Sequence, residues 1–288
     1  MKVKPCISII TVVYNDKEGF NRTAQSIISQ SSFDQIEWIV IDADSKDGTK
    51  DILEKYQSHI THTISEPDNG VYDGMNKGIA LAIAEYILFM NAGDIFTDKN
   101  VINSLLNEIS EKSTDFISGN TYLTKNNKVI GIHLSPKEIT GAFFWKNSLS
   151  HQSTLIKTKK IKTVGYDTRF KIVADAKFFF EEIILKNASY SKSDIFISKY
   201  DITGMSSTNY NLTNKEREQM LQELLPPRIH TDYRRLVSGN TTLERIILRL
   251  NKRGFRYKAI TLISIILYSP TSIKNRFIMK LKKKNCIK

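Results

Sequence analysis

The sequence has few cysteines and no long apolar run. Only two cysteines occur among its 288 residues, near opposite ends of the chain, so neither a disulfide framework nor a cysteine metal cluster is expected. Apolar runs fall short of the roughly 18–20 residues that span a bilayer, and the N-terminal run lacks a signal-peptide cleavage site. These absences predict a cytoplasmic protein.

Acidic residues are missing from one part of the chain. Residues 245–288 carry 13 lysines and arginines and no aspartate or glutamate, whereas the rest holds 29 bases against 30 acids. Apolar stretches at 243–250, 259–268 and 277–281 lie beside or among these bases, a pattern that favours helices on an anionic membrane surface. The alternative is a helical pair that packs on the rest of the chain and leaves a solvated basic edge.

The first hundred residues alternate between apolar β-branched runs and amphipathic segments. Residues 6–13, 37–41 and 85–90 predict buried strands, and residues 62–65 a shorter one. Segments with helical spacing lie between them, for example at 75–84. This alternation predicts an α/β fold with a mostly parallel central sheet flanked by helices.

The pattern changes after about residue 115. Residues 115–122 and 128–133 predict a hairpin, residues 174–186 a helix and residues 195–200 a further strand. The remainder has helical propensity and is interrupted at Pro226-Pro227. We expect three parts, which are residues 1–115, residues 116–210 and a basic helical extension at 211–288.

Polar side chains follow the predicted strands at the points where they end. Tyr14 and Asn15 follow the first strand, and Asp42 and Asp44 follow the second, while the motifs SEPDNGVYDGMNKGI and NAGD follow the next two. Open α/β sheets bind ligands beyond the carboxyl ends of their strands. Acids near a lysine at that edge suit a divalent metal that holds a diphosphate. We interpret the chain as a transferase that uses a nucleotide-activated substrate.

Six motifs in a fixed order resemble those of the family-2 glycosyltransferases, which are inverting enzymes of the GT-A fold. They are SIITVVYN, EWIVIDADSKDGT, SEPDNGVYDGMNKGI, EYILFMNAGDIF, SHQSTLIK and IVADAKFFF. The resemblance implies a Rossmann-like nucleotide-sugar-binding half at 1–115 and an acceptor-binding half at 116–210. The form with EPDxGxYDxMNKGI and NxGD resembles the subgroup that builds bacterial surface polysaccharides.

The resemblance also implies roles for residues at matching positions. Asp175 would be the base that takes the proton from the acceptor hydroxyl. Asp94 would hold the divalent metal, Mn²⁺ or Mg²⁺, and His151 and Gln152 would contact the acceptor or a phosphate. The positions expected around the nucleotide-sugar are Thr11, Tyr14, Asn15, Asp42, Asp44, Asp68, Asp73, Asn76, Lys77 and Asn91.

The sequence departs from the family pattern at two places. Ala43 stands where the family has the second of two acids, so either Asp42 or Asp44 would contact the nucleotide base. Asn91-Ala92-Gly93-Asp94 replaces the usual D-x-D, and the loss of one acid predicts weaker metal binding. Lys77 is open to two interpretations, as a phosphate contact or as a solvated helix lysine.

The resemblance implies transfer of a sugar from a nucleotide donor, with a UDP-sugar expected. The acceptor would be a lipid-linked or growing saccharide in cell-surface polysaccharide biosynthesis, such as O-antigen, capsule or exopolysaccharide. The location would be the inner face of the cytoplasmic membrane, with residues 245–288 on its anionic surface.

Two other functions stay open. A nucleotidyltransferase would carry a glycine-rich basic loop where Tyr14-Asn15-Asp16 stands. A nucleic-acid-binding protein would explain the basic segment, but the acidic loops make this partner unexpected because acids repel phosphates unless a metal intervenes.

Overall fold

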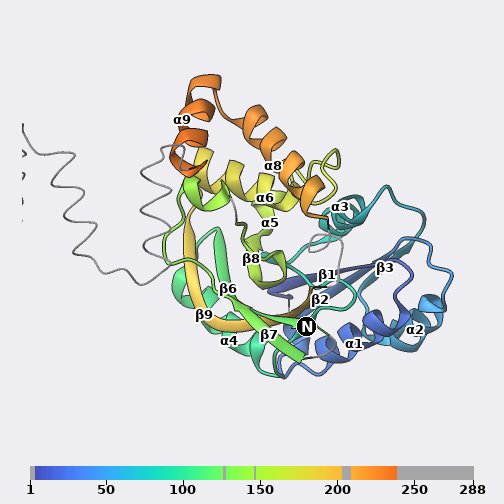
Figure 1. The fold of residues 1–288 in the computed structure, drawn as a ribbon. Helices are drawn as coiled ribbons and strands as arrows, with labels where there is room; N and C mark the ends of the chain where they lie inside the picture. Colours follow the sequence, from blue (N-terminus) through green and yellow to red (C-terminus); the bar gives the residue numbers. More distant parts are fainter. Residues whose placement is uncertain (1–3, 126–127, 146, 203–208, 239–288) are drawn as a thin grey trace, which may run out of the picture. The chain divides into compact units, whose positions relative to one another are not determined.

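The computed structural model describes residues 4–125, 128–145, 147–202 and 209–238 (Figure 1). The chain divides into two compact units, Met1–Pro226 and Pro227–Lys288. In the second unit the described part is helix α9 (Pro227–Ser238), which begins at the break expected from the two prolines. None of the helices in the described ranges is long and apolar enough to cross a membrane.

Nine strands of the described residues form one sheet in the first unit. Its order is β3-β2-β1-β4-β8-β6-β9-β5, and β7 pairs with β6. The strands are β1 (Ile7–Val13), β2 (Ile36–Asp42), β3 (His62–Ser65), β4 (Tyr86–Phe89), β5 (Ile95–Phe96), β6 (Phe116–Lys125), β7 (Lys128–His133), β8 (Thr154–Lys157) and β9 (Tyr190–Asp201).

The first four strands in sequence are parallel neighbours, as predicted. Every residue of β1 and β2 is buried, which explains their continuous β-branched sequences. Their register runs from Ile7 opposite Ile36 to Val13 opposite Asp42, so the two strands end together. The loops that follow β1 and β2 therefore start at the same edge of the sheet.

The second half of the sheet is mixed in direction. Strand β8 is antiparallel to both β4 and β6, while β6 and β9 are parallel. The predicted hairpin is present as β6 and β7, with a register shift between Leu123 and Thr124. The sheet is thus parallel where the chain alternates strand and helix, and mixed where it does not.

Helices cover both faces of the sheet (Figure 1). Helices α1, α2 and α4 lie on one face, and α3, α5 and α6 lie on the other. The bounds are α1 (Lys17–Ile28), α2 (Thr49–Tyr56), α3 (Val71–Leu81), α4 (Val101–Lys112), α5 (Thr158–Ile161), α6 (Ala174–Phe179) and α8 (Tyr210–Leu224).

Two predicted helices differ from the observed ones. Helix α3 begins at Val71 rather than at residue 75, because Gly70 has a positive φ of 120° and ends the preceding loop. The helix predicted at 174–186 is α-helical only as far as Phe179. A π-helical segment, Phe180–Leu185, then completes it.

Helix α3 packs unusually close to β1 through its glycines. A Cβ atom at Gly78 would lie 2.4 Å from Ile10 Cγ2, and one at Gly74 would lie 2.8 Å from Val12 Cγ1. Both distances are shorter than ordinary van der Waals contact. The two glycines therefore set how closely the loop before α3 can approach the strand ends.

We expect Gly78→Ala to lower the free energy of unfolding by about 1–3 kcal/mol, because overpacking outweighs the helix preference of alanine. Urea denaturation measures this change. Gly131→Ala is the matched control, since its nearest neighbour would be 3.7 Å away. An unchanged stability in Gly78→Ala would contradict the close packing of α3 on β1.

Candidate active site

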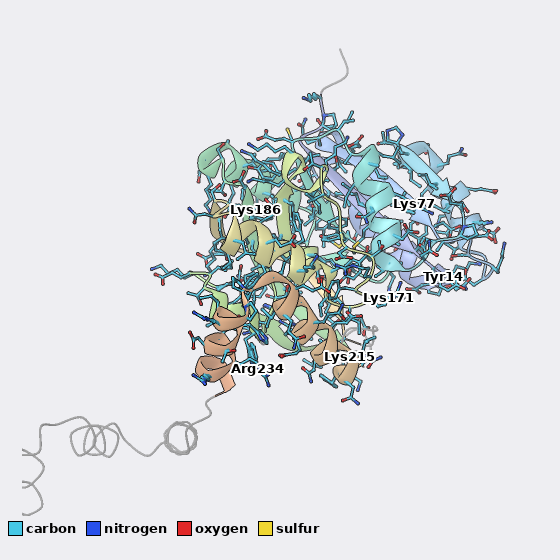
Figure 2. All side chains as sticks on the ribbon, turned by 90° about the horizontal axis from the view of Figure 1, so that it is seen from above. Tyr14, Lys77, Lys171, Lys186, Lys215 and Arg234 are labelled. Atoms are coloured by element: carbon cyan, nitrogen blue, oxygen red, sulfur yellow. The ribbon has the colours of Figure 1, made fainter. Side chains whose placement is uncertain are left out.

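The loops after β1 and β2 are tied to each other by hydrogen bonds. The backbone N–H of Asn15 donates to Ser45 Oγ at 2.8 Å, and the N–H of Lys46 donates to Asn15 Oδ1 at 2.8 Å. Asn15 has a positive φ of 46°, a conformation that asparagine tolerates better than most residues. Tyr14 is 66% exposed beside this junction (Figure 2), so its ring face is open to a ligand.

The two acids after β2 occupy different environments. Asp42 is fully buried and accepts hydrogen bonds from the N–H of Ser45 and from Ser65 Oγ, so it holds the loop from within. Asp44 lies nearer the surface, and hydrogen bonds from Lys46 and Lys50 lower its pKa to about 2. Of the two, Asp44 is the acid that a ligand outside the sheet could reach.

Thr11 lies away from the strand end, inside the core. Its side chain is fully buried, and its hydroxyl accepts a hydrogen bond from Trp38 Nε1 at 3.1 Å. The structure therefore does not bring Thr11 together with the other residues expected around the nucleotide-sugar. The physical reason is that β1 is buried on both faces, so a side chain inside it cannot reach solvent.

The polar residues of the motif SEPDNGVYDGMNKGI mainly shape its own loop. Asp68 accepts from the N–H of Gly70, and Asp73 accepts from the N–H of Asn69. Lys77 lies 2.8 Å from Glu66 Oε1 and donates to the carbonyl of Pro67 at 3.0 Å. Without a ligand, Lys77 thus contacts the loop that precedes its own helix, and its predicted contact with a phosphate stays a prediction.

Asn76 joins this motif to the second half of the first unit. Its amide nitrogen donates to the carbonyl of Tyr166 at 2.9 Å, and its amide oxygen accepts from the N–H of Tyr166 at 2.7 Å. Both ends of the side chain are therefore engaged with the backbone. Asn76 therefore links α3 to the segment that leads to α6.

A cavity of about 420 Å³ opens between these loops and the second half of the first unit. Residues from six separate stretches of the sequence line it. They include Tyr72, Asn91, Asp94, His151, Gln152 and Lys171. Four of the predicted site residues, namely Asn91, Asp94, His151 and Gln152, are thus brought to one cavity.

Asp94 is a buried carboxylate at the wall of this cavity. It is 5% exposed, and burial raises its pKa to about 7, against a smaller opposing effect of His151 and Gln152. The turn Asn91-Ala92-Gly93-Asp94 is closed by the N–H of Asp94, which donates to the carbonyl of Asn91 at 2.9 Å. Gly93 has a φ of 94° within it.

The carboxylate of Asp94 suits a divalent cation. A nearby cation favours the charged form of a buried carboxylate, and a hard oxygen is the ligand that Mg²⁺ and Mn²⁺ prefer. Among the described residues, no three histidine, cysteine, aspartate or glutamate side chains gather as a ready-made metal cluster. The predicted metal residue thus fits as one carboxylate ligand in an open cavity.

Asp175 lies directly behind the cavity wall at the start of α6. Its Oδ2 is 2.8 Å from His151 Nδ1, and its Oδ1 is 3.0 Å from the hydroxyl of Tyr72. The Tyr72 hydroxyl also lies 2.7 Å from the carbonyl of Ile172. Burial and the charge of Asp175 raise the pKa of Tyr72 well above its ordinary value, so the phenol stays a donor.

Glu216 of α8 holds the backbone that leads to Asp175, a role that the sequence did not reveal. Its carboxylate accepts from the N–H groups of Lys171, Ile172 and Val173, at 2.8, 2.9 and 3.2 Å. The side chain is 6% exposed. Because buried hydrogen bonds to a charge are among the stronger ones, this contact fixes the position of the 171–173 segment.

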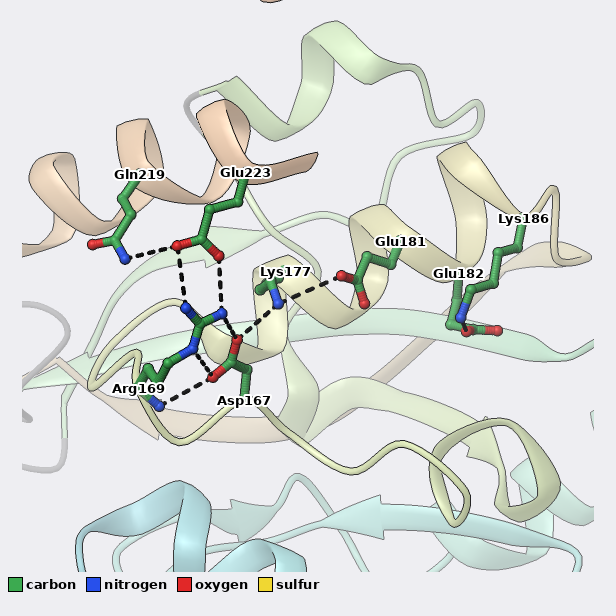
Figure 3. Close-up of polar contacts among 8 residues, drawn as sticks. All are labelled: Asp167, Arg169, Lys177, Glu181, Glu182, Lys186, Gln219 and Glu223. Carbon is green, nitrogen blue, oxygen red and sulfur yellow. Dashed lines mark hydrogen bonds and ion pairs between the residues drawn. The ribbon is translucent and has the colours of Figure 1, made fainter. Parts of the chain in front are cut away.

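A second link between the same elements lies at the surface (Figure 3). Asp167 is 2.6 Å from Arg169 and 2.8 Å from Lys177, and Arg169 is 2.9 Å from Glu223 of α8. Arg169, followed by Lys177, holds the pKa of Asp167 well below its usual range. Arg169 is 62% exposed, and exposed ion pairs contribute little, so Glu216 is the stronger of the two links.

We expect Glu216→Gln to lower the free energy of unfolding by about 1–3 kcal/mol, because an amide places a donor against backbone donors. Chemical denaturation measures the change. Glu223→Gln on the same helix is the matched control and should change stability by about 1 kcal/mol or less. Equal effects of the two substitutions would contradict the special role of Glu216.

Solved structures with the same arrangement define the class of fold. The S. aureus TarS 1–349 structure in complex with UDP-GlcNAc has a TM-score of 0.62 and 18% identity, over 81% of this chain and 71% of that one. The mannosyltransferase PcManGT from Pyrobaculum calidifontis, in complex with GDP-Man and Mn²⁺, has a TM-score of 0.60 and 13% identity, over 96% and 86%. The fold is that of the GT-A glycosyltransferases, as predicted.

The protein belongs to glycosyl transferase family 2, whose sequence profile matches residues 8–179. An uncharacterized glycosyltransferase of Mycobacterium tuberculosis is 29% identical over 212 residues, which are 72% of this chain and 79% of the relative. A PGL/p-HBAD biosynthesis glycosyltransferase of Mycobacterium bovis is 27% identical over 184 residues, or 60% and 68%. The family predicted from the six motifs is confirmed.

Proposed function

We propose that the protein is an inverting glycosyltransferase that moves a sugar from a nucleotide donor, with a UDP-sugar as the first candidate, to a saccharide acceptor. The observation that carries this proposal is the position of Asp175, which contacts Tyr72 and His151, two residues that line the same cavity as Asp94. The bound UDP-GlcNAc of TarS and GDP-Man of PcManGT support a nucleotide-sugar as the donor.

In the proposed reaction Asp175 takes the proton of the acceptor hydroxyl. The freed oxygen forms a bond to the anomeric carbon, while the bond from that carbon to the diphosphate breaks and its electron pair leaves with the nucleoside diphosphate. Attack from the opposite face inverts the configuration. Tyr72 and His151 orient the carboxylate, so little reorganisation is needed when the proton moves.

The proposed donor site spans the strand ends and the wall of the cavity. The exposed ring of Tyr14 would lie against the nucleotide base, and Asn15 and Asp44 border the same edge. Asn91 would lie near the sugar. A divalent cation, Mn²⁺ or Mg²⁺, would neutralise charge on the leaving diphosphate, and Asp94 is the residue placed to hold it.

We expect Asp175→Asn to reduce turnover by about 10²–10⁴-fold, because the amide cannot accept the proton. Release of nucleoside diphosphate from the nucleotide-sugar that the wild type uses measures turnover, and calorimetry should show nearly unchanged donor binding. Glu181→Gln is the control, because Glu181 lies on the following helical segment and pairs with Lys177. Near-normal turnover of Asp175→Asn with saturating acceptor would show that Asp175 is not the base.

We also propose that the acceptor is lipid-linked or a growing cell-surface saccharide and that the protein works at the inner face of the cytoplasmic membrane. The support is the segregation of 13 bases and no acids into residues 245–288, which lie outside the described part of the structure.

Removal of residues 245–288 should abolish binding to anionic vesicles while donor hydrolysis persists. Each base near an anionic surface contributes about 1 kcal/mol, and this attraction fades with salt. Co-sedimentation at low and high salt, with uncharged vesicles as the control, separates electrostatic attraction from apolar insertion. If the intact protein stays in the supernatant with anionic vesicles, the membrane proposal is wrong.

A further inference from the structure

The imidazole ring of His151 has one nitrogen with a partner and one without. Nδ1 lies 2.8 Å from Asp175 Oδ2. Nε2 is buried, and no donor or acceptor of the described residues lies within hydrogen-bonding distance of it. A buried polar atom without a partner is costly, so Nε2 is the ring nitrogen that a ligand could satisfy.

The partner of Nδ1 determines what Nε2 can bind. A carboxylate oxygen accepts hydrogen bonds, so the Nδ1–H tautomer of His151 is the one that donates to Asp175 Oδ2. Nε2 then carries a free electron pair. A histidine whose second nitrogen donates to a carboxylate is the usual arrangement of histidine ligands to metals.

His151 and Asp94 share the wall of one cavity. Phe89, at the end of β4, lies edge-on to the His151 ring with centroids 6.2 Å apart and limits its rotation. The carboxylate and the free imidazole nitrogen are therefore held in one restricted region.

We propose that His151 Nε2 is a second protein ligand of the cation held by Asp94, and that it compensates for the acid missing from Asn91-Ala92-Gly93-Asp94. This inference deepens the proposed function, because the cation would serve the donor diphosphate. One imidazole nitrogen added to oxygen ligands suits Mn²⁺ better than Mg²⁺, which prefers oxygen alone. The protein should therefore bind Mn²⁺ more tightly than Mg²⁺.

Electron spin-echo envelope modulation of the full-length protein with Mn²⁺, alone and with UDP, tests the ligand directly. We expect modulation from a coordinated ¹⁴N nucleus that disappears when the protein is labelled with ¹⁵N-histidine. This measurement needs no substitution, so it does not depend on the folding of a variant. A saturated Mn²⁺ complex without histidine nitrogen coupling would overturn the proposal, and so would failure of Mn²⁺ to bind saturably in both conditions.

His151→Asn should remove the nitrogen coupling and weaken Mn²⁺ binding about tenfold or more, since changes even in the partners of metal ligands cost about 10–100-fold. His59→Asn, at an exposed turn, is the matched control and should retain both properties. Asp175→Asn should also retain the coupling, because its amide oxygen can still accept from Nδ1. Unchanged Mn²⁺ affinity in His151→Asn would contradict the assignment.

The same samples separate this inference from the proposed function. Sugar transfer that persists in EDTA would refute the role of His151 as a metal ligand in the reaction and leave glycosyl transfer standing. Histidine-coupled Mn²⁺ in a protein that turns over no nucleotide-sugar would support the metal site and refute the proposed function.

Discussion

The pairing of β4 with β8 is the contact on which the candidate site depends. Strand β4 belongs to the parallel half of the sheet and leads into the turn that ends at Asp94, whereas His151 opens the short helical turn directly before β8. Ile87 lies opposite Ile156 in this antiparallel pair. The residues that line the two sides of the cavity are distant in sequence, and this junction makes them neighbours.

Aromatic rings pack around Tyr72, whose hydroxyl contacts the carboxylate of Asp175. The rings of Tyr72 and Tyr166 lie 5.3 Å apart, and Phe89 and Phe178 lie 5.5 and 5.7 Å from Tyr166. In such an environment hydrogen bonds to a charge are strengthened, and an unpaired charge is costly. The contacts from Tyr72, His151 and the N–H of Ala176 therefore hold the carboxylate of Asp175 at this position.

Much of the fold could be predicted because the sequence signals are local. The runs at 6–13 and 37–41 are rich in apolar β-branched residues, and such runs form strands buried on both faces. The same burial places Thr11 inside the core, apart from the other residues that the sequence predicts around the nucleotide-sugar. Periodicity could not separate the α-helical and π-helical parts of 174–185, because apolar residues are buried in both parts.

The parts of the site that the sequence did not reveal depend on contacts between distant segments. Tyr72 lies within a motif that was recognised, but only the approach of α6 gives its hydroxyl a carboxylate partner 103 residues away. Glu216 lies in a mostly polar helix where no periodicity marks it, and its burial follows from the docking of α8 on the 171–173 segment. A motif can show which residues carry the chemistry, whereas the residues that hold them in place are set by tertiary packing. In this protein Glu216 bonds to the backbone and Tyr72 to the side chain of Asp175. Loss of these hydrogen bonds would disturb the site without removing a group that acts on the substrate.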